Sequence, residues 1–176
     1  MIELAALALV LHPPKIVQPG EGQDVAVPFH PVEQLLRADE TMDGTAAYLF
    51  RVPPRAAGAP PHVHAREDEL FYVVSGEVAV LSEDEVVTLG AGGFAALTRG
   101  HLHAFWNEGE DEAVLFMATK GGFEEFFDAV ARAVAADPNL SPPEVGAVVG
   151  RLAAERGIEI RMDAVPDRAK PLYGME

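Results

Sequence analysis

The sequence predicts an all-β core followed by α-helices. Between residues 46 and 119, short apolar segments alternate with turn residues at regular spacing, which is typical of a β-sandwich or β-barrel. After residue 120 the apolar residues recur at helical spacing instead. A chain of 176 residues, 49% of them apolar, fits one packed domain with appended segments better than two domains.

The first segment, residues 1–45, is expected to be an N-terminal arm. It mixes short apolar stretches with Pro and Gly, and residues 32–39 are expected to form one or two helical turns. Residues 1–11 are apolar, but they contain Glu3, lack a basic start and run into Pro13 without a cleavage site, so export is the less favoured interpretation. No apolar run reaches the roughly 18 residues of a membrane span.

The second segment, residues 46–119, is expected to be the barrel core. Its predicted strands are 46–52, 70–74, 78–81, 86–89, 94–97, 103–106 and 113–119. Ser75-Gly76 is a turn signal, and residues 82–85 are expected to close a hairpin between two of these strands.

The third segment, residues 120–176, is expected to be a helical extension. The first helix is indicated by apolar residues at helical spacing, namely Phe123, Phe126, Phe127, Val130 and Val134. Ser141 and Glu144 form a capping-box pattern around Pro142, so a second helix is expected to begin there and to end near Gly157. These helices are expected to cover an open side of the barrel or a partner subunit.

Composition excludes several kinds of function. With 28 acidic and 13 basic residues, the net charge of −15 repels nucleic acid and anionic membranes, so neither is expected as a partner. The chain has no cysteine, which excludes disulfides, thiolate metal sites and cysteine nucleophiles. This composition agrees with a cytoplasmic protein.

The candidate metal ligands come from two strand-like segments. His62 and His64 are two residues apart, so their side chains lie on one face of an extended strand. Glu69 follows after four residues, and His103 begins a later strand. Three imidazoles and one carboxylate suit iron, manganese, nickel, cobalt, copper or zinc, whereas calcium and magnesium prefer oxygen ligands.

The alternative is that these histidines are structural, since a buried histidine is more often a core residue than a ligand. A His-x-His pair alone is weak evidence. Here four of the six histidines lie in or beside two glycine-bounded segments, and one segment adds an acid. That combination favours the metal interpretation.

Two spaced motifs resemble those of the cupin superfamily. The first is His62-x-His64-x4-Glu69-x6-Gly76, and the second is Gly92-x5-Thr98-x-Gly100-x2-His103-x3-Asn107. Thr98 stands where the family usually has Pro, and Ala56 stands where it usually has a leading Gly, with Gly58 nearby. Neither departure affects a ligand position. The chain as a whole looks most like single-domain bacterial cupins described as quercetin dioxygenase-like.

The resemblance implies a cupin jelly-roll β-barrel of six to eight antiparallel strands. It also implies one divalent transition-metal ion in the barrel mouth, bound by His62, His64, Glu69 and His103. Cupins of this kind commonly pair through barrel edges, so a homodimer is expected, with the N-terminal arm as a candidate cover for exposed edges.

Residues near the ligands have two interpretations each. Glu67 and Asp68 are expected to form a solvated turn, with a supporting or spare ligand role as the alternative. Phe71, Val73 and Phe105 share strand parity with the ligands, and they are candidates for a pocket wall or for ordinary core. His101 is a less favoured candidate for the pocket lining, because Gly100 is expected to break the strand before it. Trp106 is expected to pack on the outer face, with the helices as a candidate cover, and Asn107 is expected to be a structural turn residue.

Three functions follow from such a site. The first is a metal-dependent dioxygenase, an oxidoreductase that combines O₂ with a small aromatic or enolic substrate, with Glu69 as the catalytic base. The second is a non-redox isomerase or lyase that uses the ion as a Lewis acid. The third is a binding module without turnover.

Overall fold

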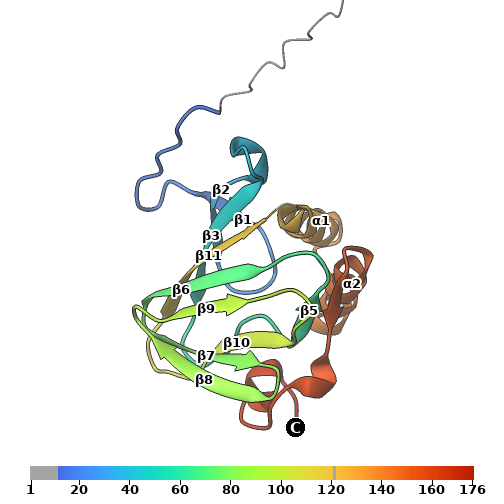
Figure 1. Cartoon of the computed structure of the whole chain (residues 1–176). Coiled ribbons are helices and arrows are strands. Elements are labelled where there is room, and N and C mark those ends of the chain that lie inside the picture. Colours follow the sequence, from blue (N-terminus) through green and yellow to red (C-terminus); the bar gives the residue numbers. More distant parts are fainter. Residues whose placement is uncertain (1–11, 121) are drawn as a thin grey trace, which may run out of the picture.

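The structure is a computed structural model that describes residues 12–120 and 122–176, and it contains two antiparallel sheets that pack against each other (Figure 1). The first sheet has the strand order β1-β2-β3-β11-β6-β9, and the second has the order β12-β5-β10-β7-β8 with β4 beside β10. This is the predicted cupin jelly roll with C-terminal helices. Residues 1–11, for which export was the less favoured interpretation, lie outside the described residues.

The strands of the first sheet are β1 (Gln23–Val25), β2 (Val32–Leu36), β3 (Thr45–Val52), β6 (Glu69–Ser75), β9 (Phe94–Leu97) and β11 (Ala113–Lys120). Those of the second are β4 (Ala56–Ala57), β5 (His62–His64), β7 (Glu77–Ser82), β8 (Glu85–Gly90), β10 (His103–Asn107) and β12 (Ile158–Ile160). The α-helices are α1 (Phe123–Ala136) and α2 (Pro142–Glu155). Short 3-10 helices lie at Ala38–Glu40, Met162–Ala164 and Lys170–Tyr173.

The core forms because side chains alternate across each strand. On β3, Tyr48, Phe50 and Val52 point inward and are buried, and β11 pairs with β3 along all eight residues. The predicted hairpin is confirmed, since β7 and β8 pair down to Ser82 and Glu85. Glu83 in its turn adopts a positive φ of 55°, which is uncommon outside glycine.

The expectation of helical turns over residues 32–39 is wrong for most of that segment. Residues 32–36 form β2, which pairs with β1 on one side and with β3 on the other. Val32 packs into the core, so ladder hydrogen bonds and burial outweigh the local helical spacing. Only Ala38–Glu40 forms a 3-10 turn.

The two helices lie together at one end of the strands, and α1 packs into the barrel (Figure 1). The ring of Tyr48 on β3 contacts Phe123 and Phe127 of α1, with ring centroids 6.1 and 5.4 Å apart. The helices therefore cover the barrel, which is one of the two expected roles. The predicted capping box of α2 is present, because the Ser141 backbone N–H donates to Glu144 Oε2 at 2.8 Å.

Trp106 lies on the outer face of the second sheet, as predicted, and is fully buried there. Its cover is the C-terminal segment, through Val165 and Ala169, and not the α-helices. The indole N–H donates to Glu108, which also pairs with Arg168 of the same segment. The C-terminal segment thus covers the outer face of the second sheet.

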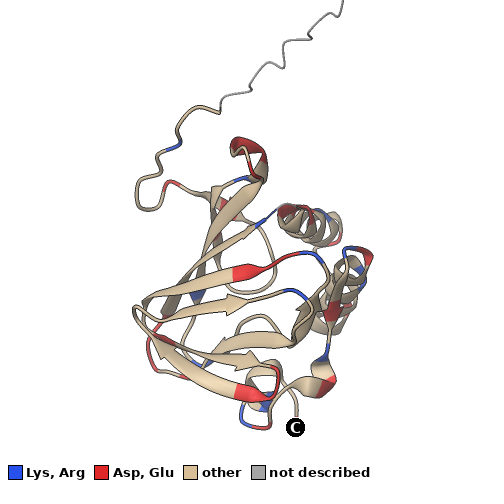
Figure 2. Cartoon of the chain, in the orientation of Figure 1, with Lys and Arg blue, Asp and Glu red and all other residues tan. Residues whose placement is uncertain are grey.

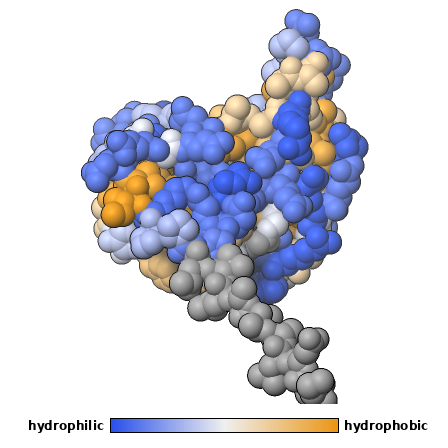
Figure 3. Space-filling view, turned by 90° about the horizontal axis from the view of Figure 1, so that it is seen from above, coloured by the Kyte–Doolittle hydropathy of each residue, from blue (hydrophilic) through white to orange (hydrophobic). Residues whose placement is uncertain are grey.

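Charged residues gather in the loops and helices, and strand surfaces carry few of them (Figure 2). The face seen from above is mainly hydrophilic, with separate apolar areas (Figure 3). Across residues 12–120 and 122–176, every helix is too short or too polar to cross a membrane.

Candidate metal centre

The four predicted ligands come together inside the barrel. His62 and His64 are the ends of β5, Glu69 is the first residue of β6, and His103 is the first residue of β10. His62 lies opposite His103 in the second sheet, while Glu69 reaches the site from the first sheet. All four side chains are at most 6% exposed.

The ligand atoms converge on one point. His62 Nε2 lies 3.0 Å from His64 Nε2, and Glu69 places one oxygen 3.5 Å from His64 Nε2 and the other 3.3 Å from His103 Nε2. One atom from each of the four residues falls within a group no wider than 4.8 Å. Two atoms each about 2.1 Å from one ion are about 3.0 Å apart at a right angle and about 3.4 Å apart at a tetrahedral angle. The spacing therefore fits a single transition-metal ion.

Each imidazole ring is oriented by a hydrogen bond at its other nitrogen, Nδ1. His62 Nδ1 donates to the Pro60 carbonyl at 2.7 Å, and His103 Nδ1 donates to the His101 carbonyl at 3.0 Å. His64 Nδ1 donates to Glu67 Oε2 at 3.1 Å. Because an acceptor oxygen keeps the proton on Nδ1, each Nε2 presents its lone pair to the centre.

Three imidazole nitrogens and one carboxylate that face each other form a group able to hold one metal ion. His103 Nε2 is buried without a hydrogen-bond partner among the described residues, which is unusual for a native polar atom. A metal ion at the centre would coordinate this atom together with the other three ligands. The residues present therefore fit the metal that the resemblance implies.

Burial and charge set the protonation states. Burial, with a smaller contribution from His103, lowers the pKa of His62 to about 3, so this ring is neutral and able to coordinate. Burial alone would raise the pKa of Glu69, but its contact with His103 and the nearby imidazoles of His64 and His62 lower that pKa to about 2. The site thus combines a neutral imidazole with an ionised carboxylate.

The prediction that Glu67 lies in a solvated turn is wrong. Glu67 is 5% exposed, and its carboxylate accepts the hydrogen bond from His64. Its neighbour Asp68 does stay at the surface, where it pairs with Arg99 at 2.7 Å. The tight turn after β5 brings Glu67 back over the ring three residues earlier, and that i,i+3 spacing is the signal that could have identified it.

The surroundings of the ligands are aromatic. Phe71, Val73 and Phe105 point inward as predicted, and Phe105 stacks on Phe50 with ring centroids 6.0 Å apart. Phe123, predicted only as part of a helical apolar face, lies 5.6 Å from the His64 ring.

Two further residues near the site, His101 and Asn107, do not place their side chains among the four candidate ligands. His101 points outward to Glu83 at 2.8 Å and contributes only its carbonyl. Asn107 is structural, because its amide group donates to the Val52 and Asp111 carbonyls.

Comparison with known proteins identifies the class. Residues 48–119 match the family described as Cupin domain. A search of curated proteins finds no match. The matched segment contains all four candidate ligands and most strands of the two sheets.

Solved structures share the fold at low identity. A sugar phosphate isomerase from a cupin superfamily, from Silicibacter pomeroyi, has a TM-score of 0.52 and 18% identity over 61% of this chain and 76% of that one. A predicted oxalate decarboxylase from Thermotoga maritima has a TM-score of 0.52 and 18% identity over 60% of this chain and 97% of that one. The polyketide cyclase RemF from Streptomyces resistomycificus has a TM-score of 0.52 and 20% identity over 60% and 78%. Similarity at this level of sequence identity shows a shared fold and no more.

Proposed function

We propose that this protein binds one divalent transition-metal ion through His62, His64, Glu69 and His103, and that it is a metal-dependent enzyme. The observation that carries the proposal is the convergence of three Nε2 lone pairs and one carboxylate, with each Nδ1 hydrogen-bonded to an oxygen. The donor set suits iron, manganese, nickel, cobalt, copper or zinc.

The reaction we propose is dioxygenation of a small aromatic or enolic compound. Four protein ligands leave one or two positions on a five- or six-coordinate ion, and the bound ion supplies redox and Lewis-acid chemistry there. Phe123 lies against His64 and continues into the aromatic core, and such surroundings favour an apolar ring in the substrate. Glu69 then lies next to the substrate hydroxyl and accepts its proton.

A non-redox isomerase or lyase is the second candidate, and one observation favours it. In the protein without an ion, the contact with His103 and the neighbouring imidazoles lower the pKa of Glu69, which makes it a weaker base. A reaction in which the ion lowers the pKa of the substrate hydroxyl depends less on the basicity of this carboxylate. The structurally similar proteins are described as an isomerase, a decarboxylase and a cyclase, although their likeness to this chain concerns the fold.

The test combines elemental analysis with an oxygen-uptake screen. The purified protein is reloaded with each first-row metal and assayed with flavonols and other enolic compounds, for both oxygen uptake and product formation. Product without oxygen uptake would favour the non-redox reaction. Absence of turnover with every metal would leave a binding module and contradict the enzyme proposal.

A matched pair of variants tests the role of Glu69. Glu69→Gln keeps the shape and one coordinating oxygen but removes the charge, so turnover is expected to fall about 10²–10⁴-fold while metal content falls less. Asp68→Asn, which neutralises the adjacent exposed acid, is the control and should retain both. If the loss of turnover in Glu69→Gln equals its loss of metal, Glu69 is a ligand only.

A further inference from the structure

The strand β5, which carries His62 and His64, is held differently along its two edges. On the barrel side it pairs with β10 at one position, where His62 lies opposite His103. Gly100, in the loop before β10, donates its N–H to the His64 carbonyl at 2.8 Å on that same side. On the other side, β12 runs antiparallel to β5 along its whole length. Most of the strand pairing of β5 therefore comes from a segment near the C-terminus.

Backbone hydrogen bonds continue this pairing past both ends of β5. The N–H of the residue after β5 donates to the Gly157 carbonyl at 2.9 Å, and the Arg161 N–H donates to the carbonyl of the residue before β5 at 2.7 Å. Because hydrogen-bonded pairs alternate along antiparallel strands, the pair of Glu159 and Val63 between them is also hydrogen-bonded. Val63 separates the two histidines, so this central pair holds the backbone between the two candidate ligands.

The two isoleucines of β12 lie beside the two imidazoles of β5. Ile158 is opposite His64 and Ile160 is opposite His62, and both pairs are of the type without hydrogen bonds, in which side chains approach most closely. Ile158 is buried in the core and Ile160 packs against that core, so both point to the same face as the histidines. Their β-branched side chains have few rotamers, which limits the movement of the adjacent rings.

The other two candidate ligands lie on strands that do not depend on β12. His103 begins β10, which pairs with β7 from that residue onward. Glu69 begins β6, which pairs with β11 on one side and with β9 on the other. Both strands lie within residues 48–119, which match the Cupin domain family, whereas β12 lies outside that segment.

We propose that β12 positions His62 and His64 for the metal ion, with Ile158 and Ile160 as the positioning residues. The effect is larger for His64, because His62 is also paired with His103 across the sheet. The helix α2 packs on β12, so the helical extension supports two ligands in addition to covering the barrel. This inference rests on the proposed metal function, and its experiments distinguish failure of the two.

The first experiment breaks the backbone pairing of β12. Glu159→Pro removes the N–H that bonds to Val63, whereas Glu159→Ala removes the same exposed side chain and keeps that N–H. In the full-length protein, Glu159→Pro should bind Co²⁺ about 10- to 100-fold more weakly in a chelator competition titration, as is typical when the support behind a ligand is lost. Glu159→Ala should bind Co²⁺ like the wild type. Equal affinity of the two variants would overturn the proposal.

A double-mutant cycle separates the positioning of His64 from a general loosening of the barrel. His64→Ala should weaken Co²⁺ binding less in the Glu159→Pro background than in the wild type, because the proline has already removed part of the contribution of that ring. His103→Ala should weaken binding by the same factor in both backgrounds. Equal coupling of His64 and His103 to Glu159→Pro would overturn the proposal.

The last experiment leaves the backbone of β12 intact. Ile158→Ala should weaken Co²⁺ binding, and Ile158→Val, which keeps a β-branched side chain beside His64, should restore most of the affinity. If Glu159→Pro does not fold, this pair decides the outcome, and wild-type affinity in Ile158→Ala would overturn the proposal. A wild-type protein that binds no first-row divalent ion would instead contradict the proposed metal function, and this inference would fall with it.

Discussion

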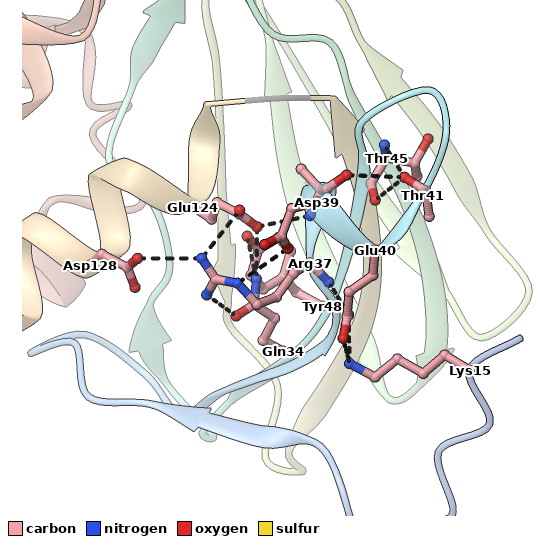
Figure 4. Close-up of polar contacts among 11 residues, drawn as sticks. Lys15, Gln34, Arg37, Asp39, Glu40, Thr41, Thr45, Tyr48, Glu124 and Asp128 are labelled. Atoms are coloured by element: carbon pink, nitrogen blue, oxygen red, sulfur yellow. Dashed lines mark hydrogen bonds and ion pairs between the residues drawn. The ribbon is translucent and has the colours of Figure 1, made fainter. Parts of the chain in front are cut away.

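Glu69 and Glu124 are both buried carboxylates, 3% and 9% exposed, but their surroundings differ. Glu124 at the start of α1 accepts hydrogen bonds from Gln34 at 3.1 Å, from Arg37 at 3.2 Å and from the Ala38 backbone N–H at 3.0 Å (Figure 4). Glu69 faces imidazole rings whose Nδ1 atoms are hydrogen-bonded on the far side, and one of the facing nitrogens, His103 Nε2, has no hydrogen-bond partner within residues 12–120 and 122–176.

The difference separates a structural carboxylate from a candidate ligand. The donors around Glu124 satisfy it completely, and because they come from β2 and the turn after it, the cluster fastens α1 to the first sheet (Figure 4). The cluster around Glu69 offers many acceptors and few donors, an arrangement that suits a cation. Burial alone does not mark a functional acid, whereas a shortage of donors does.

The largest expected effect concerns the imidazoles. His62→Ala, His64→Ala and His103→Ala should each lose most of their metal while the barrel stays folded, since the aromatic core does not depend on these rings. Elemental analysis of the purified variants measures the loss, and His101→Ala is the control because its side chain points outward. Full metal occupancy in all three variants would show that these imidazoles do not bind the ion. Glu69 would then no longer differ from Glu124 as a candidate ligand.

Glu67 tests whether the hydrogen bond behind a ligand matters. Glu67→Ala removes the acceptor that orients His64, and losses of this kind typically weaken metal binding about 10- to 100-fold. Glu67→Gln keeps an acceptor oxygen and should weaken binding less. A chelator competition titration measures both, with Asp68→Asn as the control. Equal affinity in Glu67→Ala and wild type would show that the turn, not this hydrogen bond, positions the ring.

Glu124 should show the opposite behaviour. Glu124→Ala leaves Gln34 and the Ala38 N–H without their acceptor, so the free energy of unfolding should fall by about 1–3 kcal/mol. Metal affinity should not change. Urea denaturation and the same chelator titration separate the two effects. A drop in metal affinity as large as that of Glu67→Ala would mean that α1 and the metal centre are coupled through Phe123.

The sequence was sufficient for the strands of the core and for the convergence of His62, His64, Glu69 and His103, because strand alternation and motif spacing are local signals. It was insufficient where contacts between segments far apart in the sequence determine the local structure or the burial of a residue. Residues 32–36 form a strand because they pair with β1 on one side and with β3 on the other. Trp106 is covered by residues more than 50 positions later in the sequence. The exposure of Leu70, Tyr72 and Val74 on β6 was also missed, since these residues are as apolar as the inward residues between them, and alternation of polarity is absent there.

His30 provides a third case, a buried polar residue with neither a metal nor a carboxylate beside it. Its ring lies against Phe50 and Phe105, with centroids 5.1 and 5.7 Å away, and Nδ1 lies 3.3 Å from the Pro31 carbonyl. Burial lowers the pKa of His30, and the contact with the carbonyl offsets only part of that shift. The ring is therefore neutral in the folded protein.

The smallest expected effect follows from this neutral ring. Below about pH 6.5 the unfolded chain binds a proton at His30 that the folded chain does not bind, so the free energy of unfolding falls as the pH falls through that range. Above about pH 6.5 both states are neutral, and His30 contributes no pH dependence. His30→Phe fits the aromatic neighbours and cannot be protonated, so it should lose less stability than the wild type between about pH 8 and about pH 5.5. Urea denaturation of the metal-free proteins at the two values measures the difference, because the ligand histidines contribute equally to both. An identical loss in wild type and variant would show that His30 keeps its proton affinity in the folded state and that burial against Phe50 and Phe105 does not exclude the charge.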